Sequence, residues 1–142
     1  IRFVEVTRGS GLDLPIYGMG VAIGDVNADG WLDVYLTAVG SNYLFRNEGN
    51  GKFADITSDA GVAGGSGEWG TSAAFLDYDR DGWLDLFVGN YVEWSREIDR
   101  EIDFRIAGLG RAYGGPEHHM GALNRLYRND GDDGFTEVSQ AE

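Results

Sequence analysis

The sequence lacks cysteine and holds only two prolines among its 142 residues. Without thiols, the chain has no disulfide, no thiolate zinc site and no cysteine nucleophile. No apolar run approaches the roughly 18 to 20 residues that a spanning helix needs, so we expect no membrane-spanning segment. Residues 1–7 also lack the basic start and apolar middle of a signal peptide, which predicts that any export signal is already removed or never existed.

Positive charge is scarce as well. Acidic residues outnumber basic ones by 24 to 11, which gives a formal charge of −13. Such a chain repels phosphate backbones, which argues against nucleic acid as a partner. Much of the negative charge is clustered, as at Asp77, Asp79, Asp81 and Asp85, and clustered carboxylates repel one another unless a cation lies among them. The clustering is a first indication of a metal site.

The sequence is rich in glycine and contains an internal repeat. Its 23 glycines predict many tight turns. A shift of 52 residues aligns "GDVNADGWLD" at 24–33 with "LDYDRDGWLD" at 76–85. Further on, 42–57 aligns with 124–139 only after a shift of 82, which places an insertion at roughly 91–123 of the second copy.

The apolar pattern within each copy is typical of strands. Short β-rich runs alternate with small residues and end at Asn-x-Gly turns, and four such strands in a unit of about 50 residues is the spacing of a propeller blade. We therefore predict an all-β fold of β-propeller blades, with two full repeats, an extra outer strand and one short helical insertion. The predicted boundaries within the single repeat domain or fragment 1–142 are about 8–57 for unit 1, about 58–139 for unit 2, and 1–7 for the last strand of a preceding blade.

The insertion has helical rather than strand periodicity. Ser95 is a candidate N-cap, and Ile98, Ile102 and Ile106 recur every four residues, which predicts one amphipathic helix over about 96–107. Two interpretations are open. The helix either lies over the edge of the blade, or the insertion forms a binding surface.

The repeated loop has the spacing of a calcium site. In D-x-N-x-D-G-x-x-D, oxygens at alternate positions converge as the loop curls, and the glycine allows the sharp turn. The loop is not an EF-hand, since Leu36 and Val88 stand where the position-12 glutamate would be. Metal-free Asx-type turns are the alternative. The predicted ligands of two Ca²⁺ ions are Asp25, Asn27, Asp29, the Trp31 carbonyl and Asp33, and Asp77, Asp79, Asp81, the Trp83 carbonyl and Asp85.

These units resemble the FG-GAP or VCBS repeats of integrin-α-like β-propellers, and most of all the bacterial family related to cartilage acidic protein 1. The resemblance covers nearly the whole chain. It implies a Ca²⁺-stabilised blade with the ion loop between its first and second strands, in an extracytoplasmic protein, and the aspartates and the asparagine of both loops match the family's ligand positions. The segment "YGGPEHH" at 113–119 is similar to a family insertion that often carries cysteines, which this chain lacks.

Residues with catalytic potential have non-catalytic interpretations. His118 and His119, beside Glu117, fit a loop or interface role better than a metal or catalytic one, since no second ligand pair accompanies them. The paired carboxylates have metal-ligand spacing rather than that of glycosidase acid and base. No catalytic residue is assigned. Tryptophans that recur at equivalent positions suit packing, with a sugar- or peptide-binding face as the alternative: Trp31, Trp69, Trp83 and Trp94.

The expected function is that of a non-catalytic calcium-binding module for adhesion, recognition or assembly, extracellular or periplasmic. Two alternatives are a structural subunit of a larger extracellular or membrane-associated complex or head-to-tail polymer, and an accessory domain of an enzyme whose catalytic part lies elsewhere. Two blades leave open edges, which predicts a protein partner or self-association.

Overall fold

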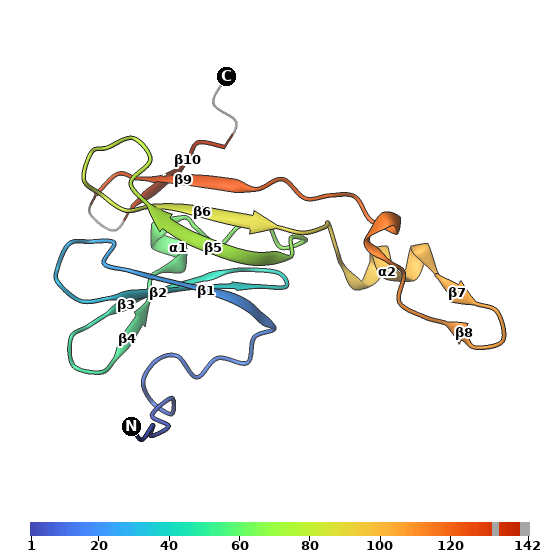
Figure 1. Ribbon diagram of the computed structural model, residues 1–142, viewed down its shortest axis with the longest axis horizontal. Coiled ribbons are helices and arrows are strands. Elements are labelled where there is room, and N and C mark those ends of the chain that lie inside the picture. Colours follow the sequence, from blue (N-terminus) through green and yellow to red (C-terminus); the bar gives the residue numbers. More distant parts are fainter. Residues whose placement is uncertain (132–133, 140–142) are drawn as a thin grey trace.

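Two four-stranded antiparallel sheets make up the body of the protein (Figure 1). The computed structural model describes residues 1–131 and 134–139, so residues 132–133 of the predicted second unit lie outside the described part. The predicted all-β fold is confirmed. The first sheet has the order β1 (Gly18–Gly24), β2 (Asp33–Ala38), β3 (Tyr43–Asn47), β4 (Phe53–Asp55), and the second has β5 (Gly70–Leu76), β6 (Asp85–Asn90), β9 (Arg125–Asn129), β10 (Phe135–Glu137).

The sequence repeat is also a repeat of strand register. In the first sheet Gly24 pairs with Asp33, and in the second Leu76 pairs with Asp85, 52 residues later in each strand. Both first strands carry an irregularity at the same place, between Gly18 and Gly20 and between Gly70 and Ser72. Equal spacing of apolar residues and turn glycines therefore yields two sheets with one local geometry.

The core lies between the two sheets. Tyr35 and Leu44 of the first sheet and Leu86 of the second are fully buried there, and each such side chain contributes about 1.5–3 kcal/mol by leaving water. The Tyr35 hydroxyl donates to the Val62 carbonyl at 2.8 Å, which satisfies the one polar atom this ring brings into the core. Gly20 permits the close approach of β1 to β5, because a Cβ atom there would lie 2.6 Å from the Thr71 carbonyl oxygen.

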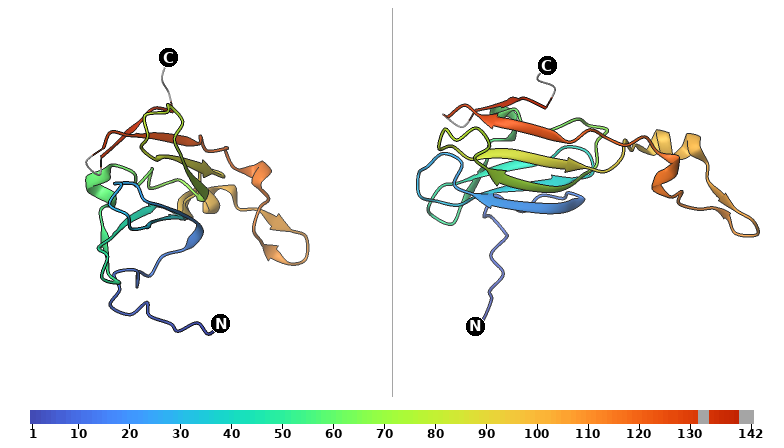
Figure 2. Two further views of the ribbon diagram at one scale, coloured as in Figure 1. Left: turned by 60° about the vertical axis from the view of Figure 1, so that its left-hand side comes forward. Right: turned by 45° about the horizontal axis from the view of Figure 1, so that its top comes forward.

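The insertion extends away from both sheets, as all views show (Figures 1 and 2). It consists of α2 (Arg96–Ile102), a hairpin of β7 (Arg105–Ile106) and β8 (Gly110–Arg111), and the 3-10 turn η1 (Pro116–His118). Ser95 caps α2 as predicted, and its hydroxyl accepts from the Ile98 amide at 3.2 Å. The prediction of helix to residue 107 is wrong, because Asp103 adopts the left-handed conformation (φ 43°) that ends a helix and the chain then pairs in the hairpin.

The roots of the insertion lie side by side at the end of β6. In the first sheet the Ala38 amide donates to Asn42 Oδ1 at 3.0 Å, which closes the short β2–β3 connection. The equivalent Asn90 amide donates to Asn124 Oδ1 at 2.9 Å, and Asn90 Nδ2 donates to the Leu123 carbonyl at 2.8 Å. The same asparagine bond thus closes both connections, and the insertion leaves the blade intact.

Two segments differ from expectation. Residues 1–7 form no strand and are exposed, because a strand needs a paired neighbour and none of the described strands lies beside them. A short helix that the repeats did not predict, α1 (Thr57–Ala60), follows β4. None of the described helices is long and apolar enough to cross a membrane.

Candidate metal centres

The loop between β1 and β2 curls around its own aspartates. The Asp25 carboxylate accepts from the amides of Asp29 at 3.1 Å and Gly30 at 2.9 Å. Asn27 Oδ1 accepts from the Asp29 amide at 3.2 Å, and Asp29 Oδ1 accepts from the Trp31 amide at 2.8 Å. Side-chain oxygens from alternate positions are therefore drawn to the inside of one tight turn.

The loop between β5 and β6 repeats these contacts one for one. The Asp77 carboxylate accepts from the amides of Asp81 at 3.1 Å and Gly82 at 3.2 Å. Asp79 Oδ1 accepts from the Asp81 amide at 3.2 Å, and Asp81 Oδ1 accepts from the Trp83 amide at 2.8 Å. Two loops at one end of the sheets, opposite the insertion, therefore share a single conformation (Figure 1).

The backbone of both loops passes twice through positive φ. Gly30 and Gly82 have φ of 89° and 96°, where a side chain would be strained. Ala28 and Arg80, two residues earlier, also have positive φ, at 56° and 67°. Non-glycine residues rarely adopt this conformation, so its recurrence at both positions indicates that the surrounding hydrogen bonds impose the turn.

A fully buried aspartate closes the first loop. Asp33, at the head of β2, accepts from the Val26 amide at 3.0 Å and from the Asn47 amide at 2.8 Å. Burial raises the pKa of Asp33; these two hydrogen bonds lower it, and the carboxylates of Asp29 and Asp25 raise it further. The net effect is a raised pKa, which means that the ionised Asp33 carboxylate is destabilised where it lies. A nearby cation would stabilise it.

Asp85 is the equivalent residue of the second loop, and its neighbour in β9 links the two loops. Asp85 is fully buried and accepts from the amides of Tyr78 at 2.8 Å and Asn129 at 2.9 Å. The Asn129 side chain donates to the carbonyls of Val26 in the first loop at 2.8 Å and Leu84 in the second at 3.1 Å. One buried amide thus joins both candidate metal centres.

The second loop brings three carboxylates to one point. Candidate ligand atoms of Asp77, Asp79 and Asp85 all lie within 4.8 Å of one another, a spacing that a single cation can bridge. Within residues 1–131 and 134–139 it is the one group of three or more potential metal-ligating side chains at this spacing. Asp81 is not part of it. The first loop has Asn27 where the second has Asp79, so it offers an amide oxygen and one charge fewer. The full set of ten predicted ligands remains a prediction.

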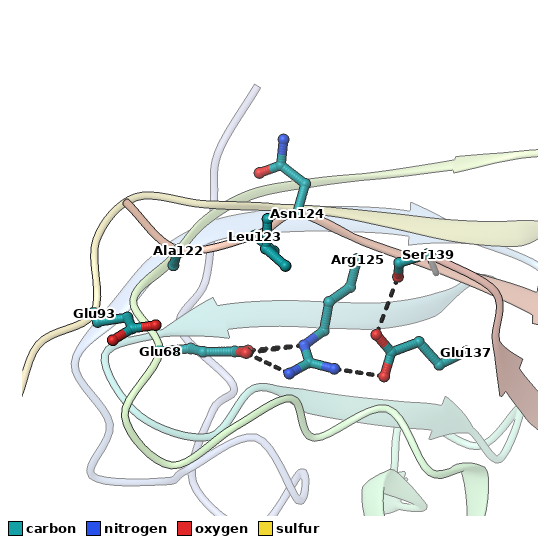
Figure 3. Close-up of a pocket in the computed structure, with 8 residues that line it drawn as sticks. All are labelled: Glu68, Glu93, Ala122, Leu123, Asn124, Arg125, Glu137 and Ser139. Atoms are coloured by element: carbon teal, nitrogen blue, oxygen red, sulfur yellow. Dashed lines mark hydrogen bonds and ion pairs between the residues drawn. The ribbon is translucent and has the colours of Figure 1, made fainter. Parts of the chain in front are cut away.

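Sequence analysis missed a polar site in which Arg125 of β9 lies between two glutamates (Figure 3). Its guanidinium contacts Glu68 through Nε at 3.0 Å and through Nη2, while Nη1 contacts Glu137. The pKa of Glu68 is lowered, because these bonds outweigh the effect of burial. Glu68, Arg125 and Glu137 line part of a cavity of about 290 Å³. The one signal in the sequence is that Arg125 replaces Tyr43 of the first repeat.

Of the other candidates, the two histidines and two of the tryptophans lie in or near the insertion. The His118 ring packs on Phe104 with centroids 5.0 Å apart, and neither histidine belongs to the acidic cluster. Trp69 packs edge-on against Trp94, with centroids 6.0 Å apart, at the root of the insertion. These two tryptophans therefore serve packing, whereas Trp31, within the first loop, is 52% exposed.

The repeat region of the chain matches a known protein family. The family described as FG-GAP-like repeat matches residues 25–88, a stretch that contains both loops. Over this stretch the chain is similar to the FG-GAP-like repeat family. Its first sheet and the β5–β6 hairpin of its second lie in or overlap the matched residues, so the family resemblance predicted from the loop motifs is confirmed.

Relatives of this chain include cartilage acidic protein 1 from three vertebrates. Over 88 residues, or 61% of this chain, it is 33% identical to the protein of Mus musculus, 35% to that of Xenopus tropicalis and 32% to that of Homo sapiens. The aligned part is 14% of the length of the mouse protein and 13% of the other two. The similarity therefore concerns the repeat and not the whole of those proteins.

Proposed function

We propose that this chain is a non-catalytic calcium-binding repeat module that serves adhesion, recognition or assembly outside the cytoplasm. The observation that carries the proposal is the grouping of Asp77, Asp79 and Asp85 within 4.8 Å in a loop whose conformation the first repeat duplicates. Three carboxylates at that spacing repel one another, and a hard divalent cation with oxygen ligands offsets the repulsion. Millimolar calcium outside cells fills even weak sites of this kind.

Calcium is favoured over other ions by the chemistry of the donors. Both loops present carboxylate and amide oxygens, and the sequence holds no cysteine and no histidine near them. Such donors suit Ca²⁺ and Mg²⁺ rather than Zn²⁺ or Cu²⁺. Ca²⁺ accepts irregular coordination by the oxygens of such turns, whereas Mg²⁺ needs near-octahedral coordination.

Calorimetric titration with Ca²⁺ after chelation tests the proposal. We expect two sites in the wild-type protein and one in Asp77→Ala, because that substitution removes a ligand of the second loop alone. A ligand bound only by the native state also raises the Tm, by an amount that corresponds to about 2.7 kcal/mol at a hundredfold excess over its Kd.

Asp59→Ala is the matched control, since Asp59 lies in α1, outside both loops. It should bind two ions as the wild type does. The metal proposal is wrong if calcium leaves the Tm of the wild-type protein unchanged.

A structural role in a larger extracellular or membrane-associated complex is the second candidate. It is favoured by the exposed apolar residues of β1, where Met19, Val21 and Ile23 are 43%, 57% and 59% exposed. It is also favoured by the projecting insertion, where Leu109 and Tyr113 are 79% and 86% exposed. Exposed apolar groups of this extent mark surfaces that contact other molecules.

A further inference from the structure

Asn47 and Asn129 are equivalent residues of the two repeats, and each supports its own loop in the same way. The Asn47 amide donates to Asp33 at 2.8 Å, and Asn47 Nδ2 donates to the Leu32 carbonyl at 3.0 Å. Asn129 makes the same two bonds in the second repeat, to Asp85 and to the carbonyl of the residue before it. In both repeats the asparagine therefore holds the buried aspartate and the backbone that leads into it.

Asn129 makes one further bond, which crosses to the other loop. Its Nδ2 also donates to the Val26 carbonyl at 2.8 Å, and an amide nitrogen carries two hydrogens for two such bonds. Asn129 Oδ1 accepts from the Gly131 amide at 2.9 Å, so the reversed amide would set its oxygen against two carbonyls. Within the described part of the chain, Asn47 makes no hydrogen bond to the second loop. The link between the loops is therefore particular to Asn129.

Val26 extends this link to the buried aspartate of the first loop. The Val26 amide donates to Asp33 at 3.0 Å. Val26 and Asn129 are each 1% exposed, and both aspartates are fully buried, so water does not compete for these bonds. A continuous series of hydrogen bonds thus runs from Asp33 to Asp85, through Val26 and Asn129.

The two loops also touch through apolar groups. Gly24 immediately precedes the first loop, and a Cβ atom there would lie 3.0 Å from Leu84 Cδ1 of the second loop and 2.9 Å from Phe75 Cδ2 of β5. This contact does not involve Asn129. A substitution of Asn129 should therefore remove the polar link and leave the loops adjacent.

We propose that Asn129 is a positioning residue for both loops and couples them, so that calcium binding by one loop strengthens binding by the other. This rests on the proposed calcium-binding function. Once Asp85 is fixed in an occupied second loop, its bond to Asn129 fixes the planar side-chain amide as well. The remaining bond of that amide then holds Val26 and, through it, Asp33. The first loop therefore loses less conformational freedom when it binds in turn.

The charges of the loops predict the opposite sign of coupling. An occupied loop has gained two positive charges and would repel a second cation, although physiological salt screens exposed charges beyond about 8 Å. The direction of the coupling therefore separates the hydrogen-bond link from simple electrostatics. We expect a factor of about five, the size of one net hydrogen bond, and linkage requires the same factor in both directions.

Site-resolved calcium titrations by NMR test the coupling. The amides of Gly30 and Gly82 donate to the first aspartate of their respective loops, so their signals report each loop separately. Asp77→Ala leaves only the first loop able to bind, and Asp25→Ala leaves only the second, so these variants give the two uncoupled affinities. Both wild-type curves should be steeper and lie at lower calcium, with one coupling factor of about five fitting both loops.

The side-chain amide of Asn129 gives a second measurement with no change at that residue. Its Nδ2 signals should shift on addition of calcium both in Asp77→Ala and in Asp25→Ala. The Nδ2 signals of Asn47 are the matched control and should shift only where the first loop binds.

Substitution of the two asparagines assigns the coupling to one of them. Asn129→Ala should reduce the coupling factor to about one while both loops still bind calcium. Asn47→Ala is the matched control, because it loses the equivalent bonds within its own loop and keeps the bond between the loops. It should weaken the first loop and leave the coupling factor at about five.

Four results would overturn the inference: wild-type curves that match those of the single-loop variants, coupling of the opposite sign, Asn129 signals that respond to one loop only, or full coupling in Asn129→Ala. In each case the loops still bind calcium and the proposed function stands. Gly30 and Gly82 signals that do not respond to calcium would instead overturn the calcium proposal, and the coupling with it. If Asn129→Ala does not fold, the Asn129 signals in the two single-loop variants decide.

Discussion

At the scale of single residues, the two loops differ in charge at two positions. Ala28 and Arg80 occupy one of them, which is not a predicted ligand position, whereas the other is. Asn27 and Asp79 occupy the same place in otherwise equivalent turns, and each accepts from the amide of the residue two positions later at 3.2 Å. The hydrogen bond that shapes the turn is therefore the same with an amide or a carboxylate. What changes is the negative charge offered to an ion.

Exchanging these residues should exchange the calcium affinities of the loops. Asp79→Asn removes one charge from the second loop and should weaken its site about tenfold, whereas Asn27→Asp should strengthen the first by a similar factor, because the charge count of the ligands tunes affinity. Calorimetry on each variant measures the change. Glu101→Gln, a loss of charge in the insertion, is the control and should leave both affinities unaltered. Equal calcium affinities in the wild type and the variants would show that the side chains of Asn27 and Asp79 do not contact the ion.

At the scale of elements, glycines decide how closely the two sheets pack. β1 contains Gly18 and Gly20, neither of which has positive φ, so both could accept a side chain on backbone grounds. Around Gly18 the nearest atom to an added Cβ is Ile16 Cδ1 at 3.6 Å, an ordinary contact. Around Gly20 it is the Thr71 carbonyl oxygen of β5 at 2.6 Å.

Alanine at these two positions should therefore have different effects. Gly20→Ala forces β1 and β5 apart and should lower the free energy of unfolding by about 1–3 kcal/mol, the usual cost of overpacking. Gly18→Ala, two residues away in the same strand, should be close to neutral. Urea denaturation measured in excess calcium compares the two variants. A similar loss in both would mean that strand propensity rather than sheet contact sets the effect.

At the scale of the whole molecule, the sheets and the insertion are separate in space. The candidate metal loops lie at one end of the sheets and the insertion leaves from the other (Figure 1). No described residue of α2 is buried. The root of the insertion continues the β6–β9 hairpin, where Val92 bridges Gly121 and the Glu93 amide donates to the Met120 carbonyl at 2.9 Å.

Cutting the insertion back to its root should leave the rest of the protein intact. We predict that replacing Ser95–His118 with Asn-Gly, a pair suited to two-residue hairpins, changes the Tm by less than about 4 °C and preserves both calcium sites. Differential scanning calorimetry and calcium titration check this. A replacement by Ala-Ala, which does not favour the turn, is the control for the hairpin chemistry. Loss of calcium binding in the Asn-Gly variant would contradict the separation of the two ends.

Much of the fold and of the candidate site could be predicted because its causes are local in the sequence. The hydrogen bonds that the first three ligand side chains of each loop accept join residues two to five positions apart, so spacing alone specified this part of the turn. Ser95 caps the residue three positions later, and strand alternation depends on neighbours in the same strand. Where a local signal was weak, prediction was wrong, as when the isoleucine spacing extended the helix past Asp103.

The sequence by itself determined the repeat, the strands, the acidic loops and the position of the insertion, because each depends on residues close together in the chain. Only the tertiary structure decided which face of each sheet is buried, since both faces carry apolar rows. It also placed Arg125 on Glu68, 57 residues away, and tied Asn129 to Val26, 103 residues away. Contacts between residues so far apart in the sequence depend on how the sheets stack. The spacing of residues in the sequence does not predict that stacking.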